Sequence, residues 1–108
     1  MPIQLTTPLN MGALDSPYQH VRIVEFDVNI ASQTINLVVQ YGNLVSSAWT
    51  NGLAIEGKTV QRFTITGSDY TTLTSSVSAA AGELYYDKIA ALLYQWLITK
   101  GYYAGTIV

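Results

Sequence analysis

The residues that carry most enzyme chemistry are few in this chain and do not gather along it. His20 is the only histidine, and its neighbours in sequence are Gln19 and Val21. A lone histidine at the start of a strand is more often a surface or capping residue than a catalyst. Glu25 and Asp27 are two residues apart on an expected strand and share a face. Acid and base roles would need different environments that separate the two pKa values, and nothing apolar nearby in sequence would raise one of them. We interpret them as a solvated strand face.

Metal and phosphate sites lack support in the sequence as well. The chain has no cysteine, which excludes disulfides and thiolate metal sites, and its acidic residues follow no calcium-loop spacing. Its eight glycines stand singly, and no glycine-rich run precedes a helix with a lysine behind it. No serine lies in an elbow motif. We therefore predict a protein that is not an enzyme and that holds no metal or cofactor.

Charge is scarce along the whole chain. Charged residues make up 11% of it and the formal net charge is -2, whereas about 25% is usual for a soluble domain. The five Lys and Arg residues are scattered singly, so the sequence predicts no nucleic-acid surface. It shows no apolar run of about 18 residues and no signal-peptide pattern at its start, so we expect a protein made in the cytoplasm with no membrane partner. A surface so poor in charge suits contact with other protein.

The elements that must position any site follow a segment rich in proline. Residues 1–20 hold all three prolines and show no helical period, which predicts an extended N-terminal arm. The adjacent apolar pair Ile23 and Val24 indicates a bulge, and Gly42-Asn43 indicates a tight hairpin turn. Alternating apolar and polar residues predict four strands, at 21–30, 34–41, 44–49 and 59–66. Because their connections are too short for crossover helices, we predict an antiparallel meander.

Helical signals come after the strands. Ser68 is the expected N-cap of a short helix. From Glu83 to Lys100 apolar residues recur at spacings of three and four, which predicts a long amphipathic helix packed on the sheet. Gly101 suits the left-handed position after that helix, with Tyr102 packing back on Leu97. Residues 21–108 are thus predicted to form a single α+β domain with an apolar tail at 102–108.

Aromatic and aliphatic residues near loops and chain ends are the remaining candidates for function. Six aromatic residues crowd the last 24 positions, and most of them are expected in the core. We expect the arm and the tail to contact neighbouring proteins, so deleting residues 103–108 should leave the domain folded and weaken its assembly. The candidate interface residues are Leu5, Leu9, Trp49, Tyr94, Tyr103, Ile107 and Val108.

Four segments stand out when the chain is taken as a whole: VRIV at 21–24, VVQYG at 38–42, ITGSDY at 65–70 and LLYQWLITKGYYAGT at 92–106. Together with the proline-bearing arm, they give the chain a resemblance to small virion structural proteins of tailed bacteriophages. The resemblance extends loosely over most of the chain. It implies a non-enzymatic piece of a phage virion, present in symmetric copies, whose partners are other virion proteins and copies of itself.

Functions from different classes follow from these observations. The first is a virion structural protein, such as a capsid decoration protein or a neck, tail or baseplate accessory subunit, acting through protein-protein contacts in a symmetric homo-oligomer. The second is a small glycan- or ligand-binding module that uses exposed Tyr and Trp side chains, above all Trp49. The third is a toxin-like or regulatory enzyme that depends on His20.

Overall fold

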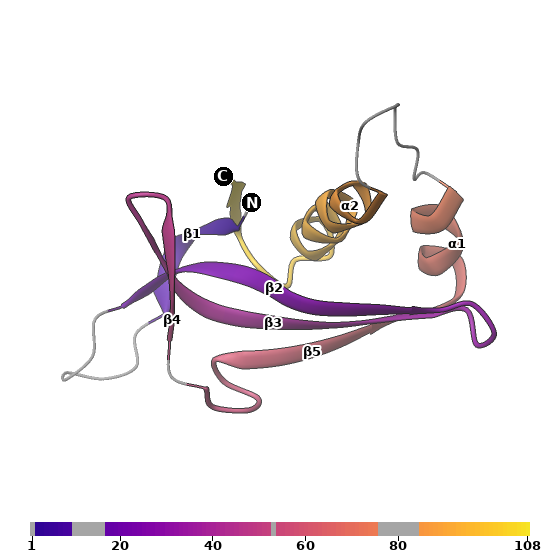
Figure 1. Cartoon of the computed structure of the whole chain (residues 1–108), viewed down its shortest axis with the longest axis horizontal. Coiled ribbons are helices and arrows are strands. Elements are labelled where there is room, and N and C mark those ends of the chain that lie inside the picture. Colours follow the sequence, from indigo (N-terminus) through magenta and orange to yellow (C-terminus); the bar gives the residue numbers. More distant parts are fainter. Residues whose placement is uncertain (1, 10–16, 53, 76–84) are drawn as a thin grey trace.

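The computed structural model describes residues 2–9, 17–52, 54–75 and 85–108, which form a six-stranded sheet and two helices (Figure 1). The strands are β1 (Ile3–Leu9), β2 (Tyr18–Asn29), β3 (Thr34–Val45), β4 (Ala48–Asn51), β5 (Val60–Ile65) and β6 (Gly105–Ile107). The helices are α1 (Gly67–Ser75) and α2 (Tyr85–Thr99). Every strand pair described is antiparallel, in the order β4-β3-β2-β1-β6, with β5 also beside β3. The predicted α+β class is confirmed. The four-strand meander is matched only in part, because β5 pairs with β3 rather than β4, and β1 and β6 also belong to the sheet.

The two long strands, β2 and β3, form the centre of the sheet. Their register shifts between Ile23 and Glu25, which confirms the bulge predicted at the apolar pair. On β3, residues of odd number from Ile35 to Val39 are buried. Their even-numbered neighbours point to the other face, as strand geometry requires. The alternation read from the sequence therefore gives the correct buried face.

The turn predicted at Gly42-Asn43 is wrong, because β3 continues through both residues to Val45. The chain reverses at Ser46 and Ser47 instead, and both have left-handed backbones, with φ of 51° and 65°. Positive φ at both central residues is the geometry of the two-residue hairpin turn that matches strand twist. Gly42 serves packing rather than turning, since a Cβ at this position would come within 2.6 Å of the Trp49 ring.

Strands β4 and β5 share one edge of β3, which the predicted meander did not anticipate. Residue 42 of β3 pairs with Asn51 of β4, and Gln40 pairs with Val60 of β5. Tyr41 lies between these two pairs, where its N–H donates to Thr59 O and its carbonyl accepts from Gly52 N–H. Strands β4 and β5 thus pair one after the other along the same edge of β3. The loop that joins them, between Gly52 and Thr59, is here called the excursion because it leaves this edge and returns to it.

The first strand corrects the expectation of a free N-terminal arm. Strand β1 is extended, as predicted, but it pairs with β2 on one side and with β6 on the other. Ile3 is fully buried in the core. Residues 10–16 of the predicted arm lie outside the described residues. The N-terminal segment that the structure describes is therefore a part of the sheet.

The C-terminal tail is likewise a part of the fold. Thr6 N–H donates to Ala104 O and Val108 N–H donates to Pro2 O, which frames the pairing of β6 with β1. Tyr103, just before β6, is only 3% exposed. Residues 103–108 are predicted from the sequence to be dispensable for folding, and the structure argues against this, since Tyr103 lies in the core and β6 pairs with β1.

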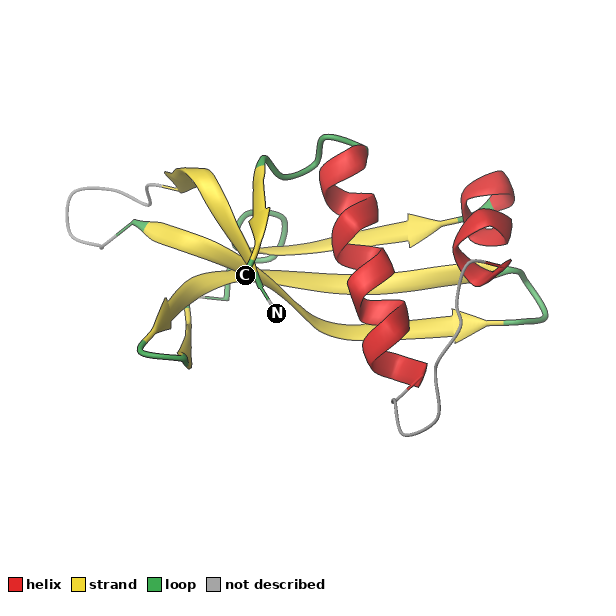
Figure 2. Ribbon diagram, turned by 90° about the horizontal axis from the view of Figure 1, so that it is seen from above, coloured by secondary structure: helices red, strands yellow, loops and turns green. Residues whose placement is uncertain are grey.

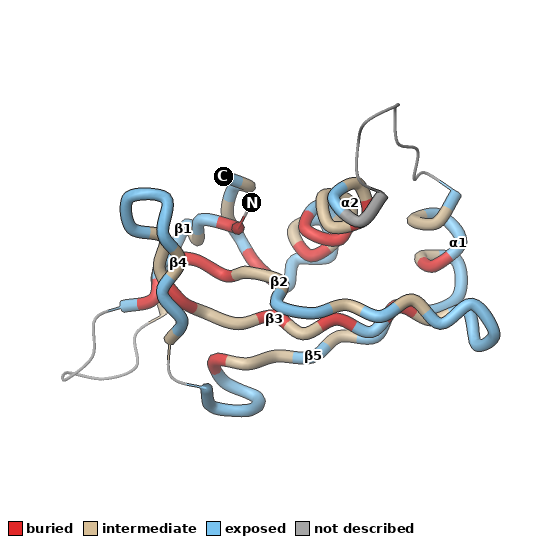
Figure 3. Tube along the Cα trace, in the orientation of Figure 1, coloured by how far each residue is buried: buried red, intermediate tan, exposed pale blue. Residues whose placement is uncertain are grey.

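Both helices lie on one face of the sheet, with α2 crossing β2, β3 and β5 (Figure 2). Helix α1 begins at Gly67, so Ser68 lies in its first turn rather than at the cap. Positions 83 and 84 of the predicted long helix lie outside the described residues. Among the described helices, none is long and apolar enough to span a membrane. The hydrophobic core consists of Ile3, Val21, Ile35, Leu37, Val39, Ile65, Tyr70, Ile89, Leu93, Tyr94, Leu97 and Tyr103. In Figure 3 buried segments lie on α2 and on the strands below it, and also on α1 and at the end of the sheet near β1 and β4.

The end of α2 agrees with the sequence. Gly101 has the predicted left-handed backbone, with φ of 80°. Its N–H donates to Ile98 O, and Tyr102 N–H donates to Leu97 O, which is the paired hydrogen bonding of a Schellman cap. This cap turns the chain sharply, so the side chains of Tyr102 and Tyr103 leave the helix in different directions.

Candidate functional site

The most prominent group of surface aromatic side chains is an aromatic ledge formed by Phe63, Trp96 and Tyr102. The Tyr102 ring lies 4.7 Å from that of Phe63 and 5.4 Å from that of Trp96, measured between ring centroids. Phe63 and Trp96 meet edge to face at 6.5 Å. Tyr102 is 52% exposed, whereas its two partners are half-buried. In the ledge, the exposed ring of Tyr102 therefore lies on the half-buried rings of Phe63 and Trp96.

Three elements position the ledge, and each does so for a local reason. Phe63 projects from β5 toward the helices because it pairs with Leu37, whose side chain is buried in the core. Trp96 is on the face of α2 that packs against the sheet, and its Nε1–H donates to Asp69 Oδ2 of α1. Tyr102 is placed by the cap at Gly101. Its ring contacts those of Phe63 and Trp96, and the predicted packing on Leu97 stays a prediction.

Grooves lie on both sides of the ledge. One, of about 610 Å³, is lined by Glu56, Gly57, Gln61, Arg62, Phe63 and Tyr102. The other, of about 350 Å³ between the two helices, is lined by Asp69, Thr72, Leu73, Leu92, Gln95, Trp96, Thr99 and Lys100. Volumes of this size suit side chains of a partner or small ligands.

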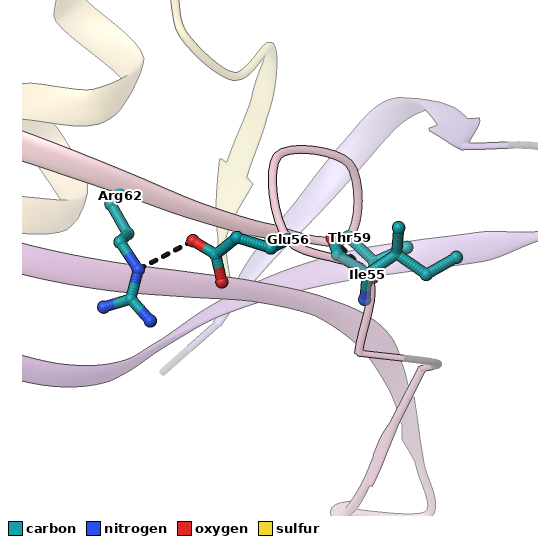
Figure 4. A network of polar contacts seen from close by, with 4 residues as sticks. All are labelled: Ile55, Glu56, Thr59 and Arg62. Atoms are coloured by element: carbon teal, nitrogen blue, oxygen red, sulfur yellow. Dashed lines mark hydrogen bonds and ion pairs between the residues drawn. The ribbon is translucent and has the colours of Figure 1, made fainter.

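The charged groups that border the ledge are paired. Arg62 Nε lies 2.7 Å from Glu56 Oε1 (Figure 4), and Glu56 raises the pKa of the guanidinium through a hydrogen bond and charge attraction. Lys100 Nζ lies 3.0 Å from Asp69 Oδ2. Hydrogen bonds from Lys100 and then Trp96 lower the pKa of the Asp69 carboxyl. Such exposed pairs add little stability, but they leave the rim of the ledge electrically neutral.

Glu56, one of the charged residues that border the ledge, belongs to the excursion between Gly52 and Thr59. Ile55 N–H donates to Thr59 Oγ1 at 2.7 Å, and Thr59 N–H donates back to Ile55 O at 2.9 Å (Figure 4). Thr59 is fully buried. Val60 is held on both sides, since its N–H donates to Ile55 O and its carbonyl accepts from Gly57 N–H. The excursion therefore closes the outer edge of β5 at Val60 against strand addition.

Two of the predicted interface residues are core residues instead. Tyr94 is 4% exposed and Tyr103 is 3% exposed. The Tyr94 hydroxyl accepts a hydrogen bond from Ile23 N–H at 2.9 Å, and the Tyr103 hydroxyl bonds to Gln61 Oε1. Burial raises the pKa of both hydroxyls, and of Tyr41 beside Tyr103. The exposed position expected for Tyr94 and Tyr103 is corrected, because falling off the helical stripe does not expose a ring that a neighbouring strand covers.

Trp49 is half-buried and already has partners. Arg22 Cζ lies over the ring, 4.7 Å from its centroid, and the indole Nε1–H donates to Asn51 Oδ1. The guanidinium covers one face of the indole ring and reduces the area on which a sugar could stack. Glycan binding at Trp49 stays a prediction.

The remaining predicted interface residues lie together around β1 and the chain end. Leu5 and Leu9 are half-buried and line a small recess with Tyr41 and Tyr103. Ile107 is half-buried in β6, and Val108 is 48% exposed. Their role in an interface stays a prediction.

His20 is buried rather than on the surface, and it acts as a cap. Its Nδ1 accepts a hydrogen bond from Leu44 N–H at 3.2 Å, at the point where β2 stops pairing with β3. The imidazole thus caps the hydrogen-bond ladder between β2 and β3, because it accepts from a β3 amide beyond the last pair. The described part of the chain contains no group of three or more His, Cys, Asp or Glu side chains arranged to hold a metal ion.

Comparisons with protein-family models, with curated proteins and with solved structures found no match. The candidate site therefore rests on the surface described above. Sequence reasoning missed the ledge because Phe63, Trp96 and Tyr102 come from three separate elements. The one signal that could have found it is Tyr102, which directly follows the predicted helix-ending glycine and therefore leaves the helix near its apolar face.

Proposed function

We propose that this chain is a non-enzymatic structural subunit that acts through protein-protein contacts, with the aromatic ledge as its main contact surface. The observation that carries the proposal is the half-exposed ring of Tyr102 on Phe63 and Trp96. Tyr and Trp are the residue types that most often dominate binding energy in protein interfaces. The resemblance to small tailed-phage proteins adds the setting, a virion in which many copies lie side by side.

The surroundings of the ledge support a protein partner over a small ligand. The apolar centre is bordered by the ion pairs Glu56–Arg62 and Asp69–Lys100, which matches the polar rim around an apolar interface centre. The grooves on either side can accept side chains from a flat partner. A partner that covers the ledge would remove Tyr102 from water, and burial of apolar area is the main driving force of association.

Self-association in solution tests the proposal. The mass of the purified chain, measured by light scattering over a concentration series, should rise above the 11.8 kDa of one chain. Tyr102→Ser should raise the concentration of half-association about tenfold, which corresponds to about 1.4 kcal/mol. Ile30→Ser is the matched control, since Ile30 is 80% exposed in the distant β2-β3 turn, and it should change nothing.

A wild-type chain that stays at the single-chain mass at every concentration would contradict the proposal. So would a Tyr102→Ser variant that associates as well as the wild type. The virion setting has a separate test in the genome. A coding sequence beside capsid or tail genes would support it, and one with no such neighbours would overturn it.

A further inference from the structure

The bulge in β2 changes which side chains share the uncovered face of the sheet. Ile23 pairs with Val39, but Glu25 pairs with Val38, so Val24 is the extra residue. In a regular strand Arg22 and Glu25 would point to opposite faces. Because the bulge shifts the alternation by one, both point away from the helices. The face opposite α1 and α2, here called the open face, therefore carries Arg22 before the bulge and two carboxylates, Glu25 and Asp27, after it. Arg62 of β5 pairs with Val38 and points to the same face, where its ion pair with Glu56 balances its charge.

Arg22 lies at one end of the open face and has no acidic partner among the residues described. Its guanidinium is stacked on Trp49. Its Nε is shielded from solvent and has no hydrogen-bond partner. Arg62, by contrast, is paired with Glu56, and Lys100 with Asp69. The Trp49 ring thus positions the Arg22 guanidinium, and its terminal Nη groups are the donors that a carboxylate of a partner would bind.

The two carboxylates lie further along the same strand. Glu25 and Asp27 are exposed, and they pair across β3 with Val38 and Asn36. Neither forms an ion pair among the described residues, although Glu25 contributes at longer range to the raised pKa of Arg62. Four residues of β3 separate the row of Arg22 from the row of Asp27, about 13 Å. The row between them holds Val38, a half-buried apolar side chain.

We propose that a second copy of this chain packs its open face against this one about a two-fold axis, with Arg22 of each copy bound to Asp27 or Glu25 of the other. This inference rests on the proposed function and names one partner for it. A two-fold axis makes every contact twice, so a face with a cation at one end and carboxylates at the other is complementary to itself. The strip of β3 between the two ends, Asn36, Val38 and Gln40, then meets the same strip of the other copy, with the ion pair Arg62–Glu56 beside it.

The size of the open face sets the strength of this contact. Strands β2, β3 and β5 lie about 4.8 Å apart, so the covered strip is narrow and falls in the lower range of specific interfaces. Sedimentation measurements should therefore extend to concentrations on the order of hundreds of micromolar. Charge attraction of this kind weakens as salt is added, so the dimer should dissociate more readily at 1 M than at 0.1 M sodium chloride.

The test is charge reversal, carried out in the full chain with Tyr102→Ser so that the ledge does not contribute. We expect this parent to sediment as a dimer at high concentration. Adding Arg22→Glu should weaken the dimer at least about tenfold, and so should adding Glu25→Arg with Asp27→Arg. An equimolar mixture of the two reversed proteins should form the dimer again, because each supplies the charge that the other lacks. Asp87→Arg on α2 is the control and should have no effect.

Circular dichroism and a cooperative thermal transition show whether each variant folds. If Arg22→Glu does not fold, Arg22→Gln and the acidic double variant test the same contact. Reversed variants that associate like the parent, or a mixture that stays monomeric, would overturn the inference. A monomeric parent beside a self-associating wild type would also overturn it while leaving the ledge and the proposed function intact. If the wild type is monomeric as well, both proposals fail.

Discussion

The two faces of strand β3 are built from adjacent residues and have opposite roles. Ile35, Leu37 and Val39 are each 1% exposed or less and pack under α2. Their neighbours Asn36, Val38 and Gln40 point to the open face, and both described helices lie on the other side of the sheet (Figure 1). The first set holds the fold together and the second set is available for contact. Along β3, side chains that stabilise the fold therefore alternate with side chains that are available for binding.

This comparison predicts that changes on the covered side unfold the protein and changes on the open side or the ledge alter only association. The largest effect should come from deleting residues 103–108. The deletion removes Tyr103 from the core and β6 from β1, and loss of a large core aromatic alone costs about 3–5 kcal/mol. We expect the cooperative urea unfolding transition to be lost. Deleting Val108 alone, which is 48% exposed, should leave that transition largely in place.

If the longer deletion instead folds with wild-type stability, the chain end does not belong to the core, and the original expectation of a free tail would be restored.

The next largest effect should come from Leu37→Ala. Leu37 is 1% exposed, and truncation of a buried leucine costs about 2–5 kcal/mol because a cavity remains. Val38→Ala, one residue away on the open face, should cost less than about 1 kcal/mol. Urea denaturation of both variants measures the difference. Equal losses would mean that the two faces are not distinct in the way proposed.

Tyr94→Phe should have an intermediate effect. It leaves Ile23 N–H without its acceptor at the edge of β2 while keeping the ring, and an unsatisfied buried donor costs about 1–3 kcal/mol. Chemical denaturation gives the loss, and hydrogen exchange at the Ile23 amide should become faster. Tyr102→Phe is the control, because its exposed hydroxyl holds no backbone group in the structure described. Unchanged exchange at Ile23 would contradict the capping role.

The smallest effect should come from Asp69→Asn at the border of the ledge. Because the folded-state pKa of Asp69 lies below its ordinary value of 3.8, its contribution is present above that value and is lost as pH falls through the folded-state pKa. The wild type should therefore melt slightly higher than Asp69→Asn near neutral pH, and the two melting curves should converge in acid. A difference that persists unchanged through an acid titration, down to a pH at which the carboxyl is fully protonated, would contradict this pairing.

Local patterns in the sequence were enough for much of the covered side. Alternation along β3 identified the buried face, the apolar pair at 23 and 24 identified the bulge, and Gly101 identified the end of α2. Each of these features depends on residues next to one another in sequence, where backbone geometry and burial leave a direct pattern.

Features that depend on distant pairing could not be predicted. Strand β1 carries Pro8 and reads as irregular, yet it is a strand because β2 and β6 pair with it on both sides. Ser46 and Ser47 form the hairpin turn although Gly42-Asn43 has the stronger turn composition. The ledge brings Phe63 to Trp96 and Tyr102, and Arg22 lies over Trp49. Both contacts join residues far apart in sequence, and only the position of Tyr102 after Gly101 gave a local sign of the ledge.

The most direct test of the account is the sedimentation velocity of the double variant Val38→Lys with Tyr102→Ser. It alters the open face and the ledge and leaves every buried core residue in place. We predict that this protein sediments as a folded monomer of one chain mass at a concentration where the wild type is associated. A double variant that associates like the wild type, or one that sediments as an unfolded chain, would contradict the separation of fold and contact on which the account depends.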